Sequence, residues 1–132
     1  MTLTPRRGEE AKAIVLDGCV FTDNNMKCDV LYLFSGSGKK VAALVELKGA
    51  GDIRHAFEQL AYTRKRRPEY QLLKAALEQS APGRLLEKAF IVTNGMLPKP
   101  EIEKLENAHG IRVSAVLQSE PSNKIPDLRD WF

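Results

Sequence analysis

Hydrophobic and polar positions along the chain fall into strand-like and helix-like patterns. Residues 30–34 are rich in β-branched and aromatic side chains, and residues 41–45 are continuously apolar. Gly and Ser residues between them predict a tight turn, so we expect a hairpin whose second strand is buried on both faces. Residues 89–93 predict another buried strand, and 111–117 a last one. The sequence of residues 19–22 is also compatible with a short strand.

Helical spacing of apolar residues predicts four helices. They cover residues 6–17, 52–67, 69–79 and 99–109, with Asp52 as the N-cap of the second. A glycine directly after the fourth helix predicts its end. The first helix depends on one apolar stripe, formed by Ala11, Ile14 and Val15.

The order of these elements predicts the fold class. It is helix, two or three strands, two helices, strand, helix and strand. Early antiparallel strands followed by β-α-β crossovers imply an α/β fold, with a mixed sheet of 4–5 strands flanked by helices. A chain of 132 residues suits one domain. We expect that domain to span residues 1–118, and the tail 119–132 to dock on it or on a partner.

Composition excludes several classes of protein. Hydrophobic residues make up 43% and charged residues 28%, a balance typical of globular proteins. No apolar run approaches the roughly 20 residues of a membrane span, and the N-terminus lacks a signal-like segment. Cys19 and Cys28 have neither zinc-site nor disulfide-framework spacing. We therefore expect a cytoplasmic protein without a membrane partner, and the net charge of +3 leans mildly toward a polyanionic partner.

The most informative polar residues are Asp29, Glu46 and Lys48. Residues two apart in a strand face the same way, so Glu46 and Lys48 project together from the end of a buried strand. Asp29 opens the neighbouring strand, and the tight turn brings it close to Glu46. Adjacent carboxylates repel unless a proton or cation intervenes, and Mg²⁺ prefers oxygen ligands. The residues therefore indicate either a divalent-cation site or a salt bridge of Lys48 with one of the carboxylates.

The spacing of these three residues resembles a known motif. Asp29, sixteen further residues, Glu46-x-Lys48, a glycine and then a helix resemble the PD-(D/E)XK nucleases, the restriction-endonuclease-like superfamily. The pattern is most similar to its resolvase-like or RecB-like members. That family has a core of helix, three strands, helix and strand, which the predicted order matches over residues 6–93. Cys28 stands where the signature has proline.

The resemblance implies roles for individual residues. Asp29, Glu46 and the backbone carbonyl of Leu47 would be metal ligands. Lys48 would position the attacking water or stabilise the phosphate, and Mg²⁺ or Mn²⁺ would be the cofactor. The resemblance implies two further catalytic residues. Glu10 would lie on the first helix, and Gln59 on the helix that follows the strand with Lys48.

Two neighbours of Gln59 on its predicted helix are possible accessory residues. His55 and Tyr62 lie within one turn of Gln59. For His55 the alternative is a solvated surface position, and for Tyr62 it is ordinary packing. RecB-like nucleases have glutamine and tyrosine four apart, whereas here the separation is three.

Basic residues near the predicted site are candidates for phosphate contact. Four cations end the helix that carries Gln59, and two more follow the hairpin turn. The alternative for the helix cations is a solvated surface that complements the helix dipole. The predicted nucleic-acid-binding residues are Lys39, Lys40, Arg64, Lys65, Arg66 and Arg67.

Two functions follow from the sequence. The first is a Mg²⁺-dependent nuclease that hydrolyses phosphodiester bonds of DNA, with RNA left open as a substrate. The second is a non-catalytic nucleic-acid-binding or assembly subunit with the same fold. A homodimer or a larger nuclease or repair assembly would supply the second active site that cutting both strands requires. Trp131 and Phe132 would pack either on their own domain or at that interface.

Overall fold

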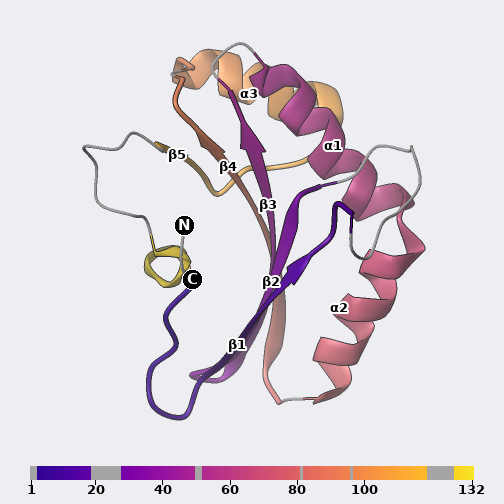
Figure 1. Ribbon diagram of the computed structural model, residues 1–132, viewed down its shortest axis with the longest axis vertical. Helices are drawn as coiled ribbons and strands as arrows, with labels where there is room; N and C mark the ends of the chain where they lie inside the picture. Colours follow the sequence, from indigo (N-terminus) through magenta and orange to yellow (C-terminus); the bar gives the residue numbers. More distant parts are fainter. Residues whose placement is uncertain (1–2, 19–27, 50–51, 81, 96, 119–126) are drawn as a thin grey trace.

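The computed structural model describes residues 3–18, 28–49, 52–80, 82–95, 97–118 and 127–132. These residues form an α/β fold with a five-stranded mixed sheet, in the order β1-β2-β3-β4-β5, and three α-helices (Figure 1). The elements in chain order are β1 Glu10–Val15, β2 Val30–Gly36, β3 Lys39–Lys48, α1 Ile53–Arg66, α2 Pro68–Ser80, β4 Arg84–Thr93, α3 Lys99–His109, β5 Ala115–Gln118 and a 3-10 helix, η1, Leu128–Trp131.

The hairpin of β2 and β3 matches the predicted one and is closed by a two-residue turn. Gly36 pairs with Lys39, which leaves Ser37 and Gly38 as the turn. Their φ angles of 53° and 76° are both positive, as a type I′ turn requires. This turn sets the register in which Val30 faces Val45.

The second half of the sheet is parallel and is built from two crossovers. β3 pairs with β4 and β4 with β5 in parallel, joined by α1 with α2 and by α3. Both crossovers step in the same direction across the sheet, and right-handed connections then place their helices on one face. Figure 1 shows α1 and α2 together on one side of the sheet, which we call the helix face.

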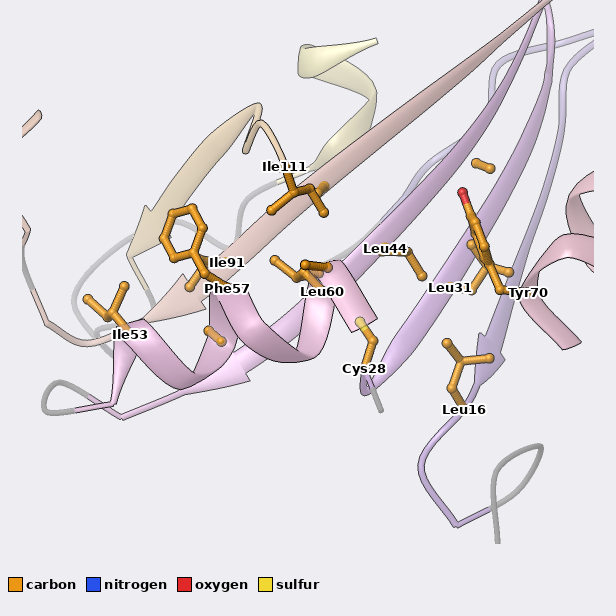
Figure 2. Close-up of a cluster of buried hydrophobic side chains, with 14 of the residues drawn as sticks. Leu16, Cys28, Leu31, Leu44, Ile53, Phe57, Leu60, Tyr70, Ile91 and Ile111 are labelled. Atoms are coloured by element: carbon orange, nitrogen blue, oxygen red, sulfur yellow. The ribbon is translucent and has the colours of Figure 1, made fainter. Parts of the chain in front are cut away.

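The main hydrophobic core lies between this helix face and the sheet. Alternate residues of β2 and β3, including Leu31 and Leu44, pack against α1 residues such as Phe57 and Leu60 (Figure 2). Tyr70 of α2 is 1% exposed and belongs to the same cluster. Continuous burial of β3 follows from this position, because β3 is the central strand of the sheet.

The opposite face of the sheet is covered in part by the end of the chain. Leu128 of η1 is fully buried in a second cluster with Phe34 and Phe90. The rings of Phe132 and Phe34 meet edge to face at 5.2 Å between centroids. Trp131, by contrast, remains 43% exposed. Residues 127–132 therefore pack on their own domain, mainly through Leu128 and Phe132.

The prediction of a first helix over residues 6–17 is wrong. Residues 10–15 form β1, which pairs antiparallel with β2 so that Glu10 faces Ser35 and Val15 faces Val30. Apolar residues at 11, 14 and 15 fit a helical stripe, but the same segment also fits a strand that an available sheet edge can pair. Tertiary pairing overrides the local pattern here. The short strand predicted at 19–22 lies outside the described residues.

The other predicted helices and strands are present, but some of their ends differ: β4 begins at Arg84 rather than at residue 89. Asp52 occupies the N-cap position of α1, but its side chain makes no capping hydrogen bond. Gly110 ends α3 in the left-handed conformation, with a φ of 64°. The last strand starts at Ala115 rather than at residue 111. No helix in the described part of the chain combines the length and apolar character needed to cross a bilayer.

Candidate functional site

Asp29, Glu46 and Lys48 come together at one end of the sheet. Asp29 directly precedes Val30, which pairs with Val45, so extending the β2–β3 register by one residue places Asp29 opposite Glu46, and their carboxyls lie within hydrogen-bonding reach. Directly opposed residues share a face, and Lys48 lies two residues beyond Glu46 on that face. The three side chains therefore stand on the helix face, where β2 begins and β3 ends.

Asp29 is held in place through its backbone and its side chain. Its carbonyl oxygen accepts a hydrogen bond from the backbone N–H of Leu16 at 2.8 Å. Its Oδ2 accepts one from the backbone N–H of Leu47, also at 2.8 Å. The Leu47 atom that contacts Asp29 is thus the amide nitrogen, whereas the resemblance assigns a role to the Leu47 carbonyl. These bonds fix the carboxylate beside the end of β3.

Cys28, the residue before Asp29, ties this end of the sheet to α1. Its backbone N–H donates to Thr63 Oγ1 at 2.8 Å, and its Sγ donates to the carbonyl oxygen of Val45 at 2.9 Å. The thiol is fully buried, and burial raises its pKa well above the ordinary value. The sequence predicts no zinc or disulfide role for Cys28 and marks it as a departure from the nuclease signature. Its small polar side chain serves here as an internal link between neighbouring elements.

Glu46 is a buried carboxyl with few donors. Its side chain is 1% exposed, and Lys48 Nζ lies 3.7 Å from Oε1, too far for a short ion pair. No hydrogen-bond donor of the described residues reaches the buried Oε2. Burial, followed by the nearby charge of Asp29, raises the pKa of Glu46 to about 9 despite the opposing effect of Lys48. Near neutral pH, Glu46 therefore carries a proton in the absence of a cation.

The chemistry of these groups is compatible with a hard divalent cation. Two carboxyls face each other, and one buried oxygen lacks a donor. Carboxylate oxygens at such a position are ligands that Mg²⁺ accepts, and Mg²⁺ commonly retains several waters. Within the described ranges, no group of three or more Asp, Glu, His or Cys residues forms a fuller metal cage. The donor set present is therefore Asp29 and Glu46.

The end of the sheet that carries Lys48 also gathers helix N-termini. Parallel strands β3 and β4 end at Lys48 and Thr93, and α1 and α3 begin shortly afterwards. A shallow groove there is lined by Leu47, Lys48, Gly49, Val92 and Asn94, and neither Asp29 nor Glu46 lines it. Carboxyl ends of parallel strands are the usual place for a ligand in open α/β sheets, and helix N-termini favour anions. The sequence analysis had not identified Asn94, although it follows a predicted buried strand directly.

Glu10 does not belong to this site. It lies on the edge strand β1, opposite Ser35, which is six residues along β2 from Asp29. At the rise of a strand, this separation is about 20 Å. The expectation that Glu10 faces the site is therefore wrong, because it depended on a first helix that the structure replaces with β1.

Lys39 and Lys40 are also far from Glu46. They begin β3, whereas Glu46 lies near its end, and the six or seven residues of strand between them span about 20 Å. Lys39 Nζ donates to the carbonyl oxygen of Phe132 at 2.6 Å, and Lys40 Nζ donates to that of Glu78 at 2.9 Å. Both ammonium groups therefore hold the fold together, and the predicted basic rim beside the site is wrong for these two residues.

Three of the four cations that end α1 have intramolecular partners. Arg64 forms an ion pair with Glu87 at 2.6 Å, in a network that Lys74 and the Tyr70 hydroxyl join. Lys65 Nζ donates to the carbonyl oxygen of His109 at 2.9 Å. Arg67 is 5% exposed and lies 3.7 Å from Glu69. Arg66 is exposed. The expected phosphate-binding cluster is therefore largely a structural one.

Gln59 follows His55 by one helical turn on α1. It precedes Thr63 by one helical turn, so both are on the α1 face toward the start of β2, and its Oε1 is buried. His55 is 43% exposed and its Nδ1 lies 3.4 Å from Glu58, as expected of a surface histidine. Tyr62 lies beneath the guanidinium of Arg67, with 6.0 Å between the guanidinium carbon and the ring centroid. Tyr62 therefore has a packing role in this structure.

Comparisons with known proteins identify no relative. No protein-family model matches the chain, and neither a curated protein nor a solved structure is significantly similar to it. The geometry of the site and the fold are therefore the grounds for a functional hypothesis.

Proposed function

We propose that this chain is a metal-dependent nuclease of the PD-(D/E)XK type that hydrolyses phosphodiester bonds of DNA. One observation carries the proposal: the buried carboxyl of Glu46 faces Asp29, lies 3.7 Å from Lys48, and has an oxygen that no described donor reaches. A fully structural carboxylate would be saturated with donors, because an unsatisfied buried polar atom is costly.

The order of the elements adds support. Three antiparallel strands, a crossover and a parallel strand resemble, in element order, the restriction-endonuclease-like core without its first helix. In that arrangement the motif residues fall where one strand begins and the next ends, as Asp29, Glu46 and Lys48 do here. The helix N-termini at the same edge favour an anionic substrate such as a phosphodiester.

Each residue has a defined task in this mechanism. Asp29 and Glu46 would hold Mg²⁺ or Mn²⁺, which supplies Lewis-acid polarisation of a phosphate oxygen and activation of water. Ionised Glu46 then replaces protonated Glu46, because a neighbouring cation offsets both its burial and the charge of Asp29. Lys48, whose side chain is 18% exposed, donates to the attacking water or to a phosphate oxygen.

A cleavage screen tests this function. Labelled linear, nicked, flap and four-way-junction DNAs are incubated with Mg²⁺ or with EDTA, using the parent chain and Glu46→Gln, Asp29→Asn and Lys48→Ala. We expect metal-dependent cleavage by the parent and its loss in all three variants. Glu101→Gln and Lys104→Ala are matched controls, since these two residues form an exposed pair at 3.6 Å on α3. Equal cleavage by the parent and the three site variants would exclude the mechanism.

One observation favours the non-catalytic alternative. Asp29 already accepts a hydrogen bond from Leu47, and Lys48 approaches Glu46, so the three residues also stabilise the end of the hairpin. A folded parent chain that binds DNA with and without Mg²⁺ and cuts none of the substrates would establish this alternative.

A further inference from the structure

The edge strand β1 has backbone groups available for pairing. β1 is the first strand of the sheet, and no described strand pairs with its outer edge. The N–H of Leu16 donates to the carbonyl oxygen of Asp29 across the β1–β2 ladder. Alternate residues of an antiparallel strand bond to the same neighbour, so Lys12 and Ile14 also bond toward β2. Ala11, Ala13 and Val15 therefore direct their N–H and C=O groups outward.

An apolar groove runs beside this open edge. It lies between β1 and α2, with Ile14, Leu33, Leu73 and Leu77 in its apolar lining and Glu10, Lys12 and Ser35 at its polar positions. Long exposed edges with apolar surroundings are templates for pairing with another chain unless charges or bulges protect them. An uncharged stripe on the outer surface of α2 continues the groove. In this stripe Leu72 is 71% exposed, and Ala75, Ala76 and Gln79 are exposed at helical spacing beside it.

The charges of β1 favour a second copy of this chain as the occupant. Two copies related by a two-fold axis pair antiparallel, and opposed residues must share a face of the joined sheet. Centring the pair on Lys12 would oppose two ammonium groups. Centring it on Ala13 would oppose Lys12 to Ile14. Centring it on Ala11 places Glu10 of each copy directly opposite Lys12 of the other, on the helix face.

Within the described residues, the side chains of Glu10 and Lys12 have no ion-pair or hydrogen-bond partner, so both are available for this exchange. The ladder itself is short, because the backbone N–H of Glu9 is already bonded to the carbonyl oxygen of Arg6 in a turn. Most of the buried area must therefore come from the groove and from α2. There, the small side chains of Ala75 and Ala76 permit close approach of the two symmetry-related helices.

We propose that β1 is a homodimer interface in which two sheets join edge to edge about Ala11, with reciprocal ion pairs between Glu10 and Lys12 and with α2 packed against its copy. The interface lies along the outer edge of the sheet. Glu10 lies opposite Ser35, at the other end of β2 from the Glu46 site. The proposal is independent of whether the chain cleaves DNA.

Charge reversal gives a specific test. The parent chain, Glu10→Lys and Lys12→Glu are each studied by sedimentation velocity at micromolar concentrations and low salt, with circular dichroism to show that each variant is folded. We expect the mass of two chains for the parent. In a dimer of either variant, residues 10 and 12 carry the same charge and lie opposite each other at two symmetry-related positions. We therefore expect each variant alone to be monomeric, or to have a dimer dissociation constant at least tenfold higher than that of the parent.

An equimolar mixture of Glu10→Lys and Lys12→Glu should then recover the dimer, because every cross-pair in the mixed species is Lys against Glu. Glu101→Lys and Lys104→Glu carry the same charge changes on α3 and should dimerise as the parent does. A monomeric parent at 100 µM would overturn the proposal. So would single β1 variants that dimerise like the parent, or a mixture that stays monomeric.

Discussion

Two buried glutamates at opposite ends of the sheet have opposite protonation behaviour. The Glu46 side chain is 1% exposed and that of Glu9 is 4% exposed. The pKa of Glu46 is raised to about 9, whereas that of Glu9 is lowered to about 2. Burial is the largest cause of the raised pKa of Glu46, whereas hydrogen bonds from Arg129 and Arg6 are the largest causes of the lowered pKa of Glu9.

The donors around each carboxylate explain the difference. Arg129 binds both oxygens of Glu9, with its Nε at 2.8 Å and its Nη2 at 2.7 Å, and the backbone N–H of Arg6 and the hydroxyl of Ser37 add two further bonds. Glu46 has a distant Lys48 and a facing carboxylate instead. A bidentate arginine with additional donors stabilises the ionised form, whereas a carboxyl short of donors awaits a proton or a cation. Glu9 therefore anchors the tail through Arg129, whereas Glu46 has no arginine partner among the described residues.

The largest expected difference between the two glutamates is in activity. Glu46→Gln keeps the shape of the side chain but removes the charge that would hold the metal, so DNA cleavage should fall by on the order of 100-fold or more. Glu9→Gln should leave the specific activity near the parent value once the folded fraction is matched. Initial rates on the best substrate of the screen measure both. Comparable losses in the two variants would contradict the division of roles.

The contributions of Glu46 and Glu9 to the free energy of unfolding should depend on pH with opposite signs. A raised pKa in the folded state means that Glu46 contributes stability below about pH 4.5, which is lost as the pH rises toward 9. Each unit of displacement corresponds to about 1.4 kcal/mol. In metal-free buffer, Glu46→Gln should therefore be more stable than the parent at pH 8, and this advantage should shrink toward pH 5. Urea unfolding at several pH values measures it.

Glu9 should show the reverse dependence. Its lowered pKa contributes stability above about pH 4.5, which is lost as the pH falls toward 2. Glu9→Gln should consequently unfold more easily than the parent at pH 7, and this difference should shrink as the pH falls toward 2. A stability difference between Glu9→Gln and the parent that is unchanged from pH 7 to pH 2 would contradict the proposed role of Arg129.

Metal should stabilise one end of the molecule only. A cation that binds the folded state at ten times its dissociation constant adds about 1.4 kcal/mol to the free energy of unfolding. We expect Mg²⁺ or Mn²⁺ to raise the melting temperature of the parent and of Glu9→Gln, but not that of Glu46→Gln. Differential scanning calorimetry with Ca²⁺-free buffers measures this, and equal shifts in all three proteins would show that the metal binds elsewhere.

The smallest expected effect concerns the geometry of the Glu9 anchor. Arg129→Lys retains the positive charge but loses the planar fork that binds both carboxylate oxygens. The melting temperature should drop modestly, and cleavage should be unchanged. Hydrogen exchange of residues 127–132 should accelerate in this variant, while exchange in β3 stays at the parent rate.

Local sequence determined much of the fold and the central part of the candidate site. The positive-φ turn at Ser37 and Gly38 sets the hairpin register, and that register alone brings Asp29 opposite Glu46. Helices α1, α2 and α3 follow from apolar spacing and from end signals such as Gly110. The hairpin turn and the helices depend on residues that are close in the chain, so the sequence alone predicts them.

Tertiary structure decided the features that depend on distant partners. Whether residues 10–15 become a helix or a strand depends on the free edge of β2, and that choice moves Glu10 to the far end of the sheet. The sequence predicts that Lys40 and Arg64 bind phosphate. In the fold, Lys40 donates to the carbonyl oxygen of Glu78, and Arg64 forms an ion pair with the carboxylate of Glu87. Glu9 and Arg129 are 120 residues apart, and no local pattern links them. Local propensities act between neighbours, whereas pairing, burial and charge are set by whichever groups the completed fold brings into contact.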